Sequence, residues 1–273
     1  MTTVAPDMRV GQLLRGWREQ RRISQLELAL RADSSARHIS FIETGRSRPS
    51  EEMILRLAEH LDVPMRERNA LLLAGGYAPQ YTETALDDPA MGALREGIKA
   101  LLEGYEPYPA LVVDATYTVV AANRGIAMLM EGLPEHLITP PVNAVRITLH
   151  PEGLASRIRN LPQWRGHLLA QMERQIALVR SDALRELYDE VAAYPLAETG
   201  ADGGHGTEHG EDEAEHAYFA LPLRIEHDGR VLSFVSSIST FNTPMDVTVA
   251  ELAIETLLPA DPATVAYLQS LTP

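Results

Sequence analysis

The chain of 273 residues contains no cysteine. Disulfide bonds, thiolate metal sites and cysteine nucleophiles are therefore excluded. The sequence also lacks any run of roughly 18 apolar residues, the length that a transmembrane helix requires. Its first residues do not contain the apolar stretch of a signal peptide, so we expect a soluble protein of the cytoplasm that does not bind a membrane.

Motifs of familiar enzymes are missing as well. The sequence has no H-E-x-x-H, no G-x-S-x-G and no P-loop, which are the patterns that place a zinc-bound water, a serine nucleophile or a phosphate cradle. Aspartate, glutamate and histidine are scattered without a recognisable catalytic spacing. We therefore expect that the chain is not an enzyme.

Positive charge is scarce overall but concentrated at one end. The chain has 24 basic and 38 acidic residues and a formal net charge of −14, which by itself argues against nucleic acid as a partner. However, residues 9–48 contain nine arginines and four acids, whereas residues 81–273 contain 12 basic and 28 acidic residues. The amino-terminal part can therefore attract phosphates, while the rest of the chain repels them.

Residues 24–49, with the sequence SQLELALRADSSARHISFIETGRSRP, have the pattern of a helix-turn-helix. We expect a first helix at 24–31, a tight turn at 32–34 and a recognition helix at 35–43. Ser24 and Glu27 have the S-x-x-E spacing of a capping box. Five apolar residues are spaced so that the two helices can pack against each other: Leu26, Leu28, Ala29, Ile39 and Ile42. An ordinary pair of short packed helices is the alternative.

Further helices are predicted on both sides of this motif. One spans residues 10–22, one begins after the capping residue Ser50, and one spans residues 65–74, closed by two glycines. Together these give a mainly α, five-helix domain at residues 8–80, large enough to read DNA by itself.

The motif resembles the lambda-repressor-like helix-turn-helix family, also called the xenobiotic-response-element type. The resemblance rests on Ser24-Gln25, Leu28-Ala29, Ile39-Ser40, Ile42-Glu43, Gly45 and Arg48-Pro49. It implies that Gln25 contacts a phosphate and that the start of the recognition helix, from Ser35, approaches base edges through Ala36, Arg37, Ser40 and Phe41. Arg46 and Arg48 would hold phosphates. A homodimer on a palindromic site of double-stranded DNA is the expected arrangement.

Two of these positions carry alternatives. Arg37 can pair bidentately with a guanine edge, and Phe41 can pack on a thymine methyl. Phe41 occupies a position that is commonly polar in this family, so the core or a contact with another chain is equally open to it. Glu43 is expected to have a structural role, holding an arginine or the following loop.

Residues 81–106 are expected to form a linker and a connecting helix that begins at Asp88-Pro89. Residues 107–273 then predict an α+β domain with about five antiparallel strands, covered on one face. One hairpin is expected at 111–114 and 118–121, and a second at 217–226 and 230–240 around Asp228-Gly229. A fifth strand is expected in the second half of 246–258. Helices are expected at 123–130, 143–150, 161–180, 182–193 and 262–271.

Three segments of this domain, residues 106–130, 143–169 and 240–264, resemble the ligand-binding domain of MmyB-like transcription regulators. With the helix-turn-helix, the resemblance covers nearly the whole chain. It implies a bacterial regulator with a PAS-like pocket for a small hydrophobic ligand, such as a fatty acid or related acyl compound, and no other cofactor. A domain that binds a protein partner instead of a small molecule is the alternative.

Large apolar side chains suit such a pocket, with an ordinary core as the alternative. They are Met128, Leu129, Met130, Trp164, Met172, Phe219 and Phe234, of which Met128, Trp164, Met172, Phe219 and Phe234 are the candidates for ligand contact. An acidic ligand also needs a cation or hydrogen-bond donors. Arg146, His150 and Arg157, which flank the turn HPEGL, are the candidates for this role, although each is also a typical surface residue.

The segment at 198–216, ETGADGGHGTEHGEDEAEH, interrupts the second domain. It is rich in glycine and acids and has almost nothing apolar to bury, so a mobile surface loop is expected. His205, His209 and His216 with the neighbouring acids offer weak ligands for a divalent metal. A glycine-rich loop does not fix ligand geometry, and we expect no specific metal site.

Overall fold

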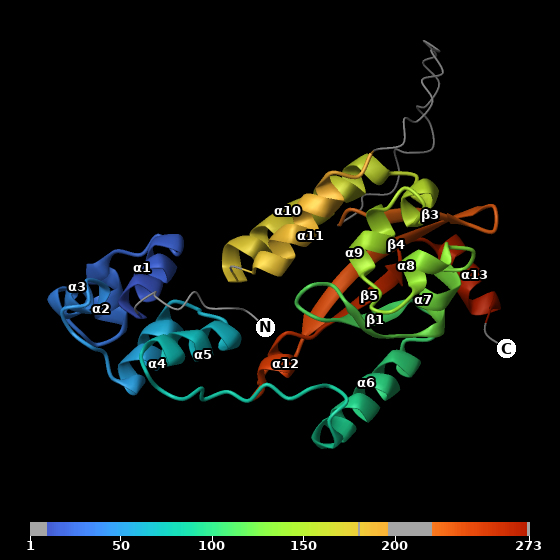
Figure 1. Cartoon of the computed structure of the whole chain (residues 1–273). Helices are drawn as coiled ribbons and strands as arrows, with labels where there is room; N and C mark the ends of the chain where they lie inside the picture. Colours follow the sequence, from blue (N-terminus) through green and yellow to red (C-terminus); the bar gives the residue numbers. More distant parts are fainter. Residues whose placement is uncertain (1–9, 180, 196–219, 272–273) are drawn as a thin grey trace, which may run out of the picture. The chain divides into compact units, whose positions relative to one another are not determined.

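The computed structural model describes residues 10–179, 181–195 and 220–271 (Figure 1). Its contacts divide the chain into two compact units. The first, which we call the amino-terminal unit, contains the chain up to Ala85 together with Ala177–Arg180 and Asn242–Ala250. The second, the sheet unit, contains Leu86–Ile176, Ser181–Phe241 and the chain from Glu251 onward.

The amino-terminal unit contains the five expected helices. They are α1 (Val10–Gln20), α2 (Gln25–Arg31), α3 (Ala36–Glu43), α4 (Glu51–His60) and α5 (Met65–Ala74). Serine caps fix three of the starts, since Ser24, Ser35 and Ser50 each accept a hydrogen bond from the backbone N–H three residues later. The short helix α12 (Val247–Ala250) also belongs to this unit.

The core of the amino-terminal unit joins all five helices. It includes Leu14, Trp17, Leu28, Ile39, Ile42, Ile54, Leu57 and Leu71, all fully buried. The prediction for Leu26 is wrong: its side chain is 62 % exposed, because Leu28 and Ala29 form the inward face of α2. At Gly11, an added Cβ would lie 2.0 Å from the carbonyl oxygen of Ile42, so α1 and the end of α3 approach too closely for any side chain.

The sheet unit is built on five antiparallel strands in the order β2-β1-β5-β4-β3. They are β1 (Ala110–Val113), β2 (Val119–Ala122), β3 (Leu223–His227), β4 (Arg230–Thr240) and β5 (Ala253–Pro259). The two hairpins and the late fifth strand are as the sequence predicts. The turn residues Asp228 and Gly229 have φ values of 49° and 69°, and such positive values at both positions are what a tight two-residue hairpin requires.

Helices pack on the two faces of this sheet. Those before β3 are α6 (Gly92–Gly104), α7 (Arg124–Leu129), α8 (Glu135–Ile138), α9 (Ala144–Leu149), α10 (Leu161–Val179) and α11 (Asp182–Ala192), with the 3₁₀ turns Pro89–Met91 and Leu154–Arg157; α13 (Pro262–Ser270) follows β5. Alternate residues of a strand face opposite sides. Ala110, Val112 and Ile254 pack toward α6, while Leu111 and Leu257 face the other way, toward an internal cavity.

Within the described ranges, no helix is long and apolar enough to span a bilayer. The histidine-rich segment 198–216 and Phe219 lie outside the described residues.

Candidate DNA-binding surface and ligand cavity

Arg37 of α3 and Arg46 of the following loop are exposed, and both lie beside the ring of Phe41. The guanidinium carbons are 5.2 Å and 5.8 Å from the ring centroid, within the range of a cation–π contact. Phe41 itself is partly buried. The aromatic ring therefore orients two cations at the recognition helix, each of which keeps its N–H donors available for bases or phosphates.

Three small residues at the start of α3 set its geometry. Ser35 caps the helix by accepting a hydrogen bond from the N–H of His38 at 3.1 Å. Ala36 is partly buried and packs against the core, and the carbonyl of Ser40 accepts the hydroxyl of Thr44 at 2.7 Å. Ala36 and Ser40 are both partly buried in α3.

Glu43, at the end of α3, anchors the motif from inside. Its buried carboxylate accepts two hydrogen bonds from Arg18, at 2.6 Å and 2.9 Å, and one from the amide Nε2 of Gln25 at 2.7 Å. The hydrogen bond to Glu43 and its charge raise the pKa of Arg18. This agrees with the structural role expected for Glu43. The amide group of Gln25 retains a second N–H, which leaves it a donor for a phosphate.

Arg48 is held by neighbouring backbone. Its Nη2 donates to the carbonyl oxygen of Gly75 at 2.9 Å, and its guanidinium lies 5.6 Å from the ring of Tyr77. The first of these contacts satisfies a carbonyl at the end of α5. Arg48 therefore connects two parts of the amino-terminal unit, in addition to any phosphate that it contacts.

The sheet unit contains an internal cavity of about 90 Å³. It lies between one face of the sheet and helices α7, α9 and α10, and its lining is mostly aliphatic. The lining residues are Leu111, Tyr117, Val119, Ile126, Leu129, Met130, Ala144, Val145, Ile147, Thr148, Leu154, Ile158, Trp164, Leu168, Gln171, Leu223, Ile225, Glu255 and Leu257.

Few polar groups interrupt this lining. Glu255 of β5 accepts a hydrogen bond from Ser236 Oγ at 2.6 Å, and burial raises the pKa of its carboxyl group. The phenol of Tyr117 donates to Gln175 at 2.8 Å, and burial raises the pKa of Tyr117 to about 12. Both groups are therefore stabilised in their uncharged forms.

Trp164 is the candidate ligand residue that lines this cavity, together with Leu129 and Met130, which the sequence also indicates as pocket side chains. The three predicted cations are not among the lining residues, because each has a local partner. Arg146 forms two 2.7 Å hydrogen bonds with Glu190 and lowers the pKa of that carboxyl to about 2. Arg157 donates to two backbone carbonyls, of Leu129 and Glu131. These arginines fix elements of the fold rather than the cavity.

The other predicted ligand residues also lie outside the cavity lining. Met172 and Phe234 are fully buried, and Phe234 belongs to the hydrophobic core. Met128 is partly buried against the same core. Met130, which the sequence indicates equally, lines the cavity, since Met128 and Met130 lie on different sides of the chain at the end of α7.

Sequence reasoning missed Glu255 and Tyr117. The signal for Glu255 was present, because a glutamate in the middle of the apolar strand AIETLL must either face solvent or be buried with a partner. Alternation along β5 places Glu255 and Leu257 on the same face. For Tyr117 we find no comparable local signal, since its hydrogen-bond partner Gln175 is 58 residues away.

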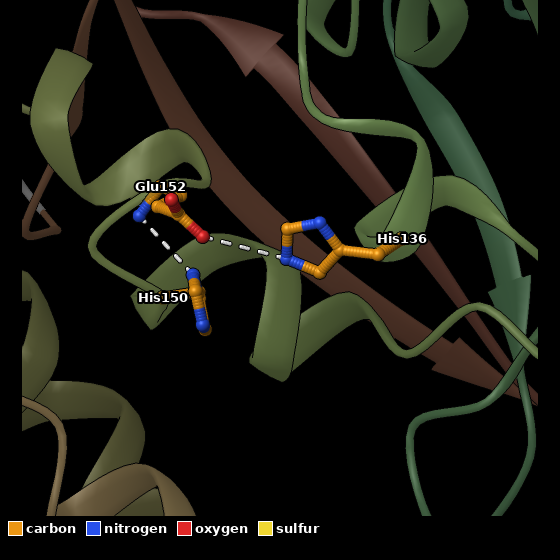
Figure 2. A group of neighbouring side chains, drawn as sticks. All are labelled: His136, His150 and Glu152. Atoms are coloured by element: carbon orange, nitrogen blue, oxygen red, sulfur yellow. Dashed lines mark hydrogen bonds and ion pairs between the residues drawn. The ribbon is translucent and has the colours of Figure 1, made fainter.

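His150 belongs to a small polar cluster with His136 and Glu152 (Figure 2). Its Nδ1 accepts the backbone N–H of Glu152 at 3.1 Å, and His136 Nε2 lies 3.5 Å from Glu152 Oε2. Two imidazoles and a carboxylate are ligands that zinc accepts. A metal would have to displace the hydrogen bond at His150 Nδ1, and the interactions within the cluster already account for its geometry.

A larger hollow of about 780 Å³ lies open to solvent beside α6 and β2. Its lining includes charged residues of both signs, among them Arg95, Lys99, Glu103 and Glu106. Long charged side chains at an open groove are typical of a solvated surface. The cavity beside α7, α9 and α10, with its mostly aliphatic lining, is the better candidate for a hydrophobic ligand.

Comparison with protein families gives two matches. The family model described as helix-turn-helix matches residues 14–68, and the model described as MmyB-like transcription regulator ligand binding domain matches residues 94–271. A search of curated proteins finds none with significant similarity. The first match contains α2 and α3 with their exposed arginines, and the second contains the whole cavity. The second match covers more than half of the chain, which therefore belongs to the family of MmyB-like transcription regulators, DNA-binding proteins with a ligand-binding domain.

Proposed function

We propose that this regulator reads a palindromic operator as a homodimer, with α3 in the major groove, and that a small hydrophobic molecule in the cavity controls this binding. The observation that carries the proposal is the exposed pair of Arg37 in the recognition helix and Arg46 in the following loop, both beside the ring of Phe41. In this arrangement Arg37 pairs with a guanine edge, while Arg46 and the amide of Gln25 bind phosphates. As a DNA-binding regulator, it acts in the bacterial cytoplasm.

Fluorescence anisotropy with DNA from upstream of its own gene tests the first part. Arg37→Ala should weaken specific binding by about tenfold or more, since a bidentate base contact contributes about 1–3 kcal/mol of discrimination. Arg56→Ala is the matched control, because Arg56 lies on α4 and pairs with Glu52. Equal losses for the two variants, or binding that does not weaken as salt increases, would contradict the proposed interface.

The sensing part rests on the cavity. Its aliphatic lining suits the chain of an acyl compound, including the fatty acid that the family resemblance implies, and the description of this unit as a PAS-like sensor belongs to the same proposal. Native mass spectrometry of the purified protein, followed by thermal unfolding with added acyl compounds, tests it. A bound compound of a few hundred daltons, or a rise in the melting temperature on adding one, supports a small ligand.

A protein partner is the second candidate for the sheet unit. Exposed apolar residues on its strands, including Val231, Ile238 and Leu258, are the observation in its favour. A mass that equals the polypeptide alone, together with no stabilisation by any acyl compound, would favour this alternative.

A further inference from the structure

The open hollow beside α6 and β2 combines apolar residues with charges of both signs. Ile98 and Leu102 of α6 are buried, while Val120 of β2 is 37 % exposed. The lining also includes Ala121 and Ala122. β2 is the last strand on this side of the sheet, and α6 packs on β1 and β2, apart from the other helices of the sheet unit (Figure 1). Another molecule can therefore reach both elements.

The charges of α6 that line this hollow are separated by sign along the helix. Arg95 and Lys99 belong to its first half, and Glu103 belongs to its last turn. Residues four apart on a helix are neighbours and can form an ion pair. Lys99 and Glu103 are nevertheless both exposed, and neither side chain has an ion-pair or hydrogen-bond partner among the described residues. Both charges are therefore available to a partner molecule.

Each end of the hollow adds one further charge. The guanidinium of Arg95 donates to the backbone carbonyls on either side of Asp87, which places Asp87 at the end that carries Arg95. At the other end, the carboxylate of Glu106 accepts the backbone N–H of Arg124 at 2.9 Å. Both Asp87 and Arg124 line the hollow. Every charge at one end thus has a counterpart of opposite sign at the other end.

We propose that this hollow is an interface between two copies of the chain, in which α6 of the second copy lies antiparallel to α6 along the hollow. In an interface with twofold symmetry, residue i contacts residue j and residue j contacts residue i. An antiparallel arrangement therefore brings the basic end of each hollow to the acidic end of the other. This inference rests on the proposed homodimer and names its interface. The contacts pair Lys99 with the partner's Glu103, Arg95 with the partner's Glu106 and Asp87 with the partner's Arg124.

The distribution of charge favours a second copy over an unrelated protein. Residues 81–273 contain 12 basic and 28 acidic residues, so two copies repel each other over most of this surface. An interface between copies has to lie where positive charges gather, and three of the basic residues line this hollow together with three acids. The couples Lys99–Glu103 and Arg95–Glu106 are also centred on the same turn of α6, as a twofold axis at that turn requires. An unrelated partner would not require this symmetry.

Sedimentation velocity of the full chain over a range of concentrations measures the dissociation constant of the dimer. Lys99→Glu alone, or Glu103→Lys alone, should raise this constant about tenfold or more, because twofold symmetry makes each substitution create two contacts between like charges. An equimolar mixture of the two variants should form a dimer about as tight as wild type, since each substituted residue then faces its opposite charge. Both positions are exposed, and lysine and glutamate suit a helix equally, so both variants should fold.

Arg185→Glu and Glu186→Lys, at exposed positions of α11, are the matched controls, because they change the net charge by the same amounts and should leave the dimer unchanged. A dimer that neither substitution in α6 weakens, or a mixture no tighter than its separate components, would overturn the inference and leave the homodimer standing. A chain that is monomeric at every concentration would also overturn it. If the complex with operator DNA then contains a single copy, the proposed homodimer fails as well.

Discussion

The buried ion pair between Arg18 and Glu43 makes the stability of the DNA-binding motif unusually sensitive to one arginine. The Glu43 side chain is 3 % exposed and that of Arg18 is 12 % exposed. Replacing Arg18 with alanine removes two hydrogen bonds from the carboxylate and leaves it buried with Gln25 alone. The perturbation therefore creates a buried charge without a counter-charge.

The expected cost is large. Removing one partner of a buried ion pair costs about 3–5 kcal/mol, because the remaining charge has lost its compensation. A domain has a total stability of about 5–15 kcal/mol, so Arg18→Ala should remove a substantial part of it. Arg15, on the same helix, pairs with Glu19 at the surface and is 59 % exposed. Arg15→Ala should therefore cost no more than about 1 kcal/mol.

Urea unfolding followed by tryptophan fluorescence measures this difference. The chain has two tryptophans, and a Trp164→Phe background leaves Trp17, which is buried in the core of the amino-terminal unit, as the reporter. Arg18→Ala should lower the midpoint by about 2–3 M urea at typical m-values. If Arg18→Ala and Arg15→Ala unfold at the same urea concentration, the ion pair does not stabilise the motif and the reasoning is refuted.

Three further predictions concern other parts of the chain. Arg146→Ala should lower the free energy of unfolding by up to about 1 kcal/mol at pH 7. Because the pKa of Glu190 in the folded protein is depressed to about 2, this difference from wild type should be complete above pH 4.5, the ordinary pKa of a glutamate, and should disappear as the pH falls toward 2. Urea titrations between pH 2 and pH 7 measure it. Gly11→Ala should destabilise the amino-terminal unit by about 1–3 kcal/mol, because the added Cβ clashes with α3. Gly97→Ala in α6 should instead stabilise the sheet unit by up to about 1 kcal/mol in the same urea assay, because the added Cβ meets no atom within 4 Å. Asp246→Ala should lower the urea midpoint of the amino-terminal unit, because it removes the hydrogen bonds that the Asp246 carboxylate accepts from the hydroxyls of Thr82 and Thr84; an unchanged midpoint would contradict this role.

Local signals predicted most elements of this fold, but not the short helices α8 and α12. Ser24, Ser35 and Ser50 mark helix starts because a hydroxyl caps the backbone within three residues, and Asp228-Gly229 marks a hairpin because both residues tolerate positive φ. The error at Leu26 has a physical cause. Spacing alone is compatible with several apolar faces on a helix of seven residues, and tertiary packing selects one of them.

The ligand site was harder to predict, because its chemistry depends on residues far apart in the sequence. Arg146 was a reasonable candidate for an anion partner until Glu190, 44 residues later, supplied a carboxylate nearer at hand. Glu255 and Trp164 line the same cavity although they belong to β5 and α10, which lie far apart in the sequence. The pattern of apolar residues within either segment does not show that the two residues share a cavity. A single glutamate within an apolar strand could nevertheless have indicated that Glu255 is buried.

The connection between β4 and β5 is a stretch of chain that joins the two units. This connection, Asn242–Ala250, belongs to the amino-terminal unit, where Asp246 accepts hydrogen bonds from the hydroxyls of Thr82 and Thr84 at 2.8 Å and 2.7 Å. The same stretch of chain continues into β5, which carries Glu255. Under the proposed sensing function, a ligand that shifts β5 acts on a strand whose preceding residues belong to the amino-terminal unit. Coupling between ligand binding and DNA binding then requires that the ligand favour one position of this strand over another. The factor by which the ligand changes the affinity for DNA must equal the factor by which DNA changes the affinity for the ligand.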